Sequence, residues 1–194
     1  MCRQLITPQE WEEHGGWALG DREEWSDRAC GMACLRMILL AYGRPAPTVT
    51  ELLKLAVKHE IMTPRGAAHA GLADLAASYG VPGRAEPVAA EDLPERLAAG
   101  PLIISITGQF PEDGRRGGHL VIARGYEDSG DAGTGPLILT RDPSLWGQTH
   151  DRLPLARVAA SYTGRAITFP PLHRFPAATE QTEDAPPHER TATT

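Results

Sequence analysis

The spacing of apolar residues in the first half of the chain is that of amphipathic helices. Residues 30–42 read CGMACLRMILLAY, where Ala33, Met37 and Leu40 recur at helical spacing. Gly43 and the two prolines that soon follow it end this predicted helix. Further helices are predicted over residues 48–59, 71–79 and 91–99.

The pattern becomes strand-like after residue 100. Four aliphatic or β-branched runs are bounded by Gly, Pro and Asp, and they cover residues 102–107, 119–124, 137–140 and 166–169. A parallel sheet needs helical crossovers between its strands, and no helical pattern separates these runs. The order of elements therefore predicts an α+β fold in which N-terminal helices pack on an antiparallel sheet.

The two ends of the chain differ from its centre. Residues 1–29 are polar but carry Trp11, Trp17 and Trp25, whose indoles are expected to fold this segment over the domain. Residues 176–194 contain no large aliphatic or aromatic residue and are expected to form a disordered tail. We therefore expect one domain over residues 1–175, a size that suits the 194-residue chain.

Composition excludes several classes of partner. Lys and Arg number 19 against 25 Asp and Glu, and the resulting net charge of −6 has the wrong sign for nucleic-acid binding. No signal peptide and no apolar run of about 20 residues is visible, so no membrane partner is expected. Three cysteines are a poor disulfide framework and suit a reducing compartment, which predicts a cytoplasmic protein with a free thiol. The sequence is silent on oligomeric state.

Metal and cofactor chemistry has little support in the sequence. Cys30 and Cys34 are spaced as a ligand pair could be, but the second pair that tetrahedral zinc sites usually need does not appear. No glycine-rich phosphate loop follows a strand. We expect neither a metal nor a cofactor.

Cys30 and His119 are the first candidates for chemistry. Cys30 opens the strongest predicted helix, where the helix dipole favours a thiolate, whereas Cys34 lies one turn deeper among apolar residues and is interpreted as core. The alternative for Cys30 is a partly buried structural cysteine. His119 opens an apolar strand directly after two glycines, which suits a general base, while the other six histidines, His69 included, have the polar surroundings of solvated side chains.

Asp142 is the candidate that would orient His119. It ends the strand-like run 137–140 and precedes a proline. If that run and the run beginning at His119 form an antiparallel hairpin, the start of the first strand lies beside the end of the second. Asp142 would then be a neighbour of His119 and could stabilise the imidazolium. The alternative is that Asp142 is only a turn residue.

These residues together resemble the papain-like bacteriocin-processing peptidases, which cut peptides after a double-glycine leader. The resemblance rests on a Cys-Gly-x-Ala-Cys sequence opening a helix, a Gly-His opening an apolar strand, and an Asp-Pro after the next strand. It implies a papain-like fold, with Cys30 as nucleophile, His119 as base and Asp142 as the orienting residue. The implied substrate is a peptide, whose amide is cleaved through a thioester acyl-enzyme.

One departure from that family concerns the oxyanion hole. The family has a glutamine six residues before the nucleophile, and this chain has Glu24, whose ionised carboxylate cannot donate. The alternatives are a protonated Glu24, another side chain such as Trp25, Gln109 or Gln148, the Cys30 backbone N–H alone, or a shifted alignment.

The residues leave two further functions open. The same triad could transfer its acyl group to an amine, which would make the protein an acyl or peptidyl transferase. The domain could also bind a leader-like peptide without cutting it.

Overall fold

The computed structural model describes residues 1–106, 118–130 and 135–172. The expected tail at 176–194, Gln109 and the expected strand end at 107 lie outside the described residues. The helices are α1 (Pro8–Glu13), α2 (Arg22–Asp27), α3 (Cys30–Ala41), α4 (Val49–Lys58), α5 (His69–Ser78), α6 (Leu93–Ala99) and α7 (Leu155–Ser161). Short 3₁₀ turns are η1 (Gly16–Leu19), η2 (Ala90–Asp92) and η3 (Trp146–Gln148).

The described strands form one large antiparallel sheet and one small hairpin. The hairpin pairs β1 (Met62–Thr63) with β2 (Gly66–Ala67). The six-stranded sheet has the order β3-β8-β4-β5-β6-β7. Its strands are β3 (Arg84–Pro87), β4 (Leu102–Ile106), β5 (His119–Glu127), β6 (Leu137–Arg141), β7 (Arg152–Pro154) and β8 (Tyr162–Thr168).

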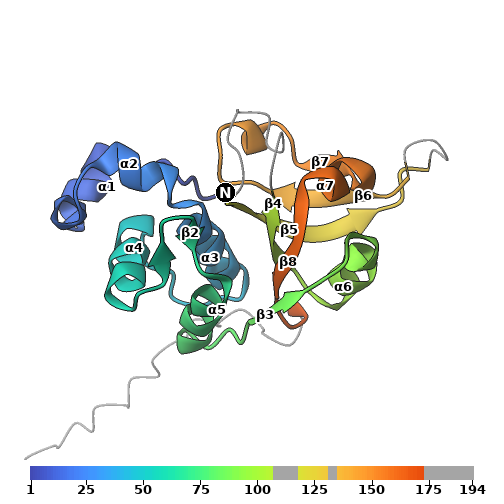
Figure 1. Cartoon of the computed structure of the whole chain (residues 1–194), viewed down its shortest axis with the longest axis horizontal. Coiled ribbons are helices and arrows are strands. Elements are labelled where there is room, and N and C mark those ends of the chain that lie inside the picture. The colour runs from blue at the N-terminus through green and yellow to red at the C-terminus, as the bar shows by residue number, and fades with distance from the viewer. Residues whose placement is uncertain (107–117, 131–134, 173–194) are drawn as a thin grey trace, which may run out of the picture.

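Helices cover both faces of the large sheet, so the core has two parts (Figure 1). The first part joins α3, α4 and α5 to alternate sheet residues such as Ile103, Leu120 and Ile167. The second joins α6 and α7 to the opposite face, through residues such as Ile104 and Val121. Because successive strand side chains point to opposite faces, neighbouring residues of β4 and β5 enter different halves of the core. The α+β class and the papain-like architecture predicted from the sequence are confirmed.

Local chemistry explains where several helices begin. Thr48 caps α4 with a complete capping box, in which its hydroxyl accepts from the Glu51 amide and the Glu51 carboxylate accepts from the Thr48 amide. Asp21 caps α2 through the amides of Glu23 and Glu24. None of the helices in the described ranges is long and apolar enough to cross a lipid bilayer.

The structure also differs from the predicted elements. Residues 1–29 form the short helices α1 and α2, and of the three indoles only that of Trp11 is fully buried, while Trp17 stays exposed. Helix α5 begins at His69, two residues earlier than expected, and β5 extends to Glu127. β3 and α7 carry no clear periodicity, so they were not predicted.

Candidate active site

Cys30 is the first residue of α3, the helix that packs directly on β5. Its Sγ lies 3.8 Å from the carbonyl oxygen of Gly118, the residue before β5. No side chain caps the start of α3, because Ala29 at the N-cap has no polar group. The N-terminal end of the helix dipole therefore acts on the thiol, and this arrangement favours the thiolate.

Cys34 lies one turn further along α3 and has a different environment. Its side chain is fully buried, and its Sγ donates to the Leu120 carbonyl at 3.3 Å. Burial, followed by the charges of nearby groups, raises the pKa of the Cys34 thiol well above its usual range. Cys34 is thus core, as the sequence predicted.

His119 begins β5 and is paired across the sheet with Ile106 of β4. The His119 side chain is buried, with an exposed fraction of only 4%. The Nε2–H donates to the Asp142 carboxylate, with 2.8 Å between Nε2 and Oδ1. The second ring nitrogen, Nδ1, is also buried. Because Nε2 is hydrogen-bonded to Asp142, Nδ1 is the ring nitrogen that can exchange a proton with a thiol.

Asp142 follows β6 and is fully buried. Its Oδ1 also accepts from the backbone N–H of Ser144 at 2.8 Å, a turn that holds the carboxylate toward His119. Gly147 makes room for this turn, since a Cβ at that position would lie 2.2 Å from the Asp142 Cβ. β5 and β6 are antiparallel neighbours, as predicted from the sequence.

The electrostatics of His119 are dominated by three opposing effects. Burial lowers its pKa, but side-chain hydrogen bonds to Asp142 and Cys30 and the charges of both groups outweigh burial and raise the pKa to about 9. The Cys30 Sγ lies 3.8 Å from the carbonyl oxygen of Gly118, the residue before His119, so the thiol is close to the imidazole. The three sequence candidates thus lie together, in an arrangement that favours an imidazolium at neutral pH.

A cavity of about 710 Å³ opens at Cys30. It lies between the helical lobe and the sheet, and we refer to it as the cleft. One wall comes from the end of α2 and the start of α3, another from the β1–β2 hairpin and the start of α5, and the floor from the sheet. Its described lining includes Asp27, Cys30, Gly66, His69, Leu120 and Thr163. A cavity of this volume is large enough for several residues of an extended chain.

The β1–β2 hairpin closely approaches Gly118, the residue just before β5. A Cβ on Gly118 would lie 2.8 Å from the Arg65 carbonyl oxygen, and its φ of +71° is one that side-chain-bearing residues rarely adopt. Glycine is therefore required here for two separate reasons. This contact holds the hairpin beside the residue that precedes His119.

The side chains considered for the oxyanion hole lie mostly elsewhere. Glu24 is exposed and sits 3.8 Å from Arg28 on the helix surface, and the Trp25 indole N–H donates to the Leu19 carbonyl. Neither is oriented for a donor role in the cleft. Gln148 Oε1 accepts from Arg3, and Gln109 lies outside the described residues.

Gln4 is a further candidate for the oxyanion-hole donor, and it was not identified from the sequence. It is buried, its backbone N–H donates to the Pro143 carbonyl, and its Nε2 donates to the Ser26 carbonyl at 3.3 Å. It thus joins Pro143, the residue after Asp142, to Ser26 near the end of α2, four residues before Cys30. The sequence offered only a weak signal for this role: Gln4 is one of two glutamines that precede Cys30 in the chain.

The structure also places an unexpected basic group in the cleft. His69, expected to be solvated, is half-buried in the cleft wall, and Arg165 of β8 lies near it. Burial lowers the pKa of His69, and the charge of Arg165 adds to this effect. Across the described ranges, no group of three or more His, Cys, Asp or Glu side chains is placed to hold a metal ion.

Comparison with known proteins gives a consistent result. The model of the Peptidase_C39 like family matches residues 6–166. The fold is similar to a double glycine motif protease from an AMS/PCAT transporter, solved in complex with the leader peptide, with 22% identity, 73% of this chain and 84% of that chain covered, and a TM-score of 0.53. It is also similar to the peptidase domain of Streptococcus ComA, with 20% identity, 75% and 93% coverage, and a TM-score of 0.57. No curated protein matches the sequence.

Proposed function

The chain belongs to the Peptidase_C39 like family, and from that premise we propose that it cleaves a peptide amide with Cys30 as nucleophile. The observation that carries the proposal is the buried pair of His119 and Asp142, 2.8 Å apart, beside a cysteine that opens a helix and lines a large cleft. A structural cysteine needs neither a charged partner nor a cavity. The domain proposed for this activity spans residues 1–175, which include the whole family match.

The proposed reaction begins from a thiolate and an imidazolium. The Cys30 Sγ attacks the substrate carbonyl carbon, and the bond to the leaving nitrogen breaks after His119 gives that nitrogen its proton. A water molecule, deprotonated by His119, then attacks the thioester carbon, and the C–S bond breaks to release the acid product and restore the thiolate and the imidazolium. Asp142 acts as a positioning residue, because it holds the imidazole by Nε2 and stabilises its positive charge.

The negative charge that develops on the substrate carbonyl oxygen must be stabilised by hydrogen-bond donors. We assign the Cys30 backbone N–H, at the start of α3, as one donor. Gln4 is our candidate for the side-chain donor, because its buried carboxamide is hydrogen-bonded to Ser26 of α2, four residues before Cys30. This assignment replaces Glu24, whose carboxylate faces solvent beside Arg28.

The proposed substrate is a peptide with a leader-like segment. The similar transporter protease was solved with its leader peptide bound, and the cleft here has the volume to hold an extended chain. Two alternatives keep the same geometry. Acyl transfer to an amine uses the same thioester, and leader binding without cleavage would need only the cleft.

The test uses the full chain and a pool of synthetic peptides that contain double-glycine sites. New peptide termini are mapped by mass spectrometry after incubation with the wild-type protein and with Cys30→Ala. We expect termini that appear only with the wild type, with hydrolysed ends. Products joined to an added amine such as glycinamide would favour the transferase, and binding of the pool without any cleavage would favour the leader-binding domain.

Variants separate the roles within the site. Cys30→Ala and His119→Ala should both abolish turnover, because nucleophile and base act as a unit. Asp142→Asn should reduce kcat about 10- to 10³-fold, since the amide keeps the shape but loses the charge. Its positioning role also predicts a changed pH profile of kcat, which a merely structural residue would not produce. Full activity of Asp142→Asn and Asp142→Ala would mean that Asp142 is only a turn residue.

A further inference from the structure

The charged side chains that line the cleft are mostly cationic, although the protein as a whole has a net charge of −6. Arg28, Arg65 and Arg165 come from three different elements, and Asp27 is the only carboxylate among the described lining residues. A cleft with one sign of charge raises the local concentration of groups with the opposite sign. Positive charge is therefore concentrated in the cleft, where a substrate would lie.

The three arginines are not equivalent. Arg28 is already used, because it donates to the Thr63 carbonyl, stacks on the Trp25 ring and lies 3.8 Å from Glu24. Arg65 and Arg165 are exposed, and within the described ranges no carboxylate pairs with either. Within the part of the chain that the structure describes, these two guanidinium groups are available for a ligand.

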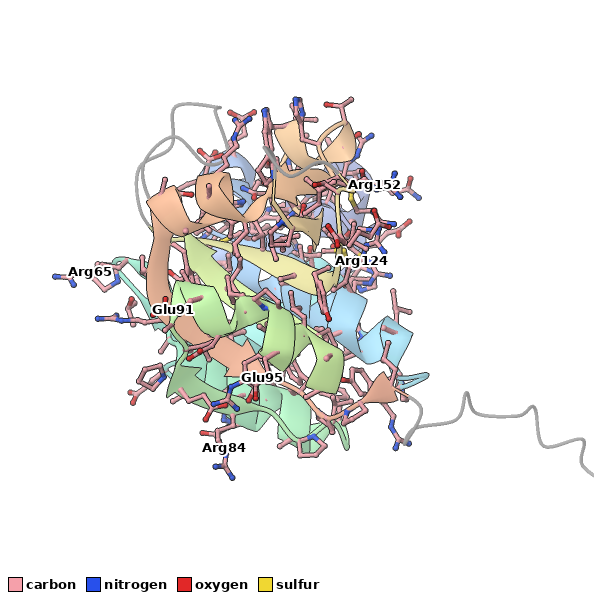
Figure 2. The ribbon with its side chains drawn as sticks, turned by 90° about the vertical axis from the view of Figure 1, so that its right-hand side faces the viewer. Arg65, Arg84, Glu91, Glu95, Arg124 and Arg152 are labelled. Atoms are coloured by element: carbon pink, nitrogen blue, oxygen red, sulfur yellow. The ribbon has the colours of Figure 1, made fainter. Side chains whose placement is uncertain are left out.

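Their positions place them at two sides of the cleft. Arg65 lies at the turn of the β1–β2 hairpin, where its backbone carbonyl is next to Gly118 at the start of β5. Its side chain extends from the edge of the molecule (Figure 2). Arg165 rises from β8 in the floor, close to His69 at the start of α5 and near Thr163. An extended peptide that crosses from Cys30 toward β8 would pass both groups.

We propose that this cleft selects acidic peptides, with Arg65 and Arg165 pairing with Asp or Glu side chains close to the bond that is presented to Cys30. The inference rests on the proposed function, since it places a peptide in the same cleft. Guanidinium groups suit this role because their planar donors match the geometry of a carboxylate. Lys or Arg side chains at the same substrate positions would meet repulsion.

The exposure of both arginines limits the size of the effect. Exposed ion pairs are weak, and two of them together predict that a Glu peptide binds about 3- to 10-fold more tightly than its Gln counterpart. The preference should shrink when the NaCl concentration is raised about tenfold, because salt screens exposed charges.

Binding is measured separately from cleavage. The probes are short N-acetylated peptide amides with a central Gly-Gly, in which a single Glu, Gln or Lys is moved through the flanking positions. Their Kd values are measured by NMR titration against Cys30→Ala, which cannot turn them over. The same titrations are repeated with Arg65→Gln and Arg165→Gln added, and with Arg84→Gln as the matched control, since Arg84 is exposed on β3 away from the cleft (Figure 2).

We expect at least one position at which Glu binds more tightly than Gln, and Lys more weakly. Arg65→Gln or Arg165→Gln should remove that difference, and Arg84→Gln should preserve it. Equal Kd values at every position, a preference that survives both cleft substitutions, or no peptide binding at millimolar concentration would each overturn the inference.

Cleavage of the same peptides by the wild-type protein distinguishes this inference from the proposed function. A Glu preference in binding without any cleavage would overturn the peptidase proposal and leave the acidic-peptide site intact. Cleavage of Glu and Gln peptides with the same kcat/KM, together with equal Kd values, would support the peptidase proposal and overturn the inference that the cleft selects acidic peptides.

Discussion

The link between His119 and Asp142 predicts how the stability of the protein depends on pH. The perturbation is Asp142→Asn, which keeps the shape of a fully buried side chain and removes its charge. The Asn oxygen can still accept from the Ser144 N–H, so the turn itself should persist. What changes is the free energy of placing a positive charge on His119.

The magnitude follows from the pKa of His119. Burial lowers this pKa, but Asp142 and Cys30 raise it from the ordinary 6.5 to about 9. That rise corresponds to about 3 kcal/mol in favour of the folded protein with a charged imidazole. Because the folded-state pKa is the higher one, this stability is fully present below pH 6.5 and is lost as the pH rises through 9. The cost of Asp142→Asn should therefore be greatest near pH 6 and should shrink by up to about 3 kcal/mol by pH 9.5.

The assay is urea unfolding followed by tryptophan fluorescence, with both proteins measured from pH 6 to 9.5. The quantity of interest is the difference in stability between the two proteins at each pH. The raised pKa of Cys34 lowers the stability of both proteins at the alkaline end, and its largest cause, burial, is common to both. An NMR titration of the His119 ring should show its pKa lowered in Asp142→Asn. A cost that is the same at every pH, or a His119 titration unchanged by the substitution, would refute the reasoning.

Three further predictions concern other parts of the chain. Iodoacetamide at neutral pH should modify Cys30 well before Cys34, because burial raises the pKa of Cys34, and peptide mapping that finds Cys34 modified first would contradict the nucleophile assignment. Gln4→Ala should lower kcat about 10²- to 10³-fold with little change in KM, whereas Glu24→Gln, the control on the exposed helix surface, should leave both unchanged. Deleting residues 176–194 should leave Tm within error, since the segment has no large apolar side chain to bury, and a drop of several degrees would show that it docks on the domain.

Elements whose signals are local could be predicted from the sequence. The helix that begins at Cys30 was evident because its apolar residues repeat at helical spacing and Gly43 follows it. The start of α4 followed from Thr48, whose capping partner is only three residues away. The strands β4, β5 and β6 were found because they are apolar runs between turn residues.

The approximate meeting of His119 and Asp142 could be predicted for a related reason. Strands that follow one another in the sequence commonly pair, and the antiparallel pairing of β5 with β6 brings the start of β5 beside the end of β6. The 2.8 Å hydrogen bond between His119 and Asp142 and the burial of both side chains could not be predicted from the sequence, because they depend on Gly147 and on the sheet around them.

The sequence by itself thus determined the α+β class, the helix that presents Cys30 and the candidates for its partners, since periodicity, caps and turns act over a few residues. Only the tertiary structure decided which groups surround that cysteine. Gln4, near the start of the chain, reaches the end of α2 just before Cys30, and Arg165 joins Arg65 in one cleft from a strand 100 residues away. Contacts between such distant segments depend on how the sheet and helices pack as a whole, and no local pattern encodes them.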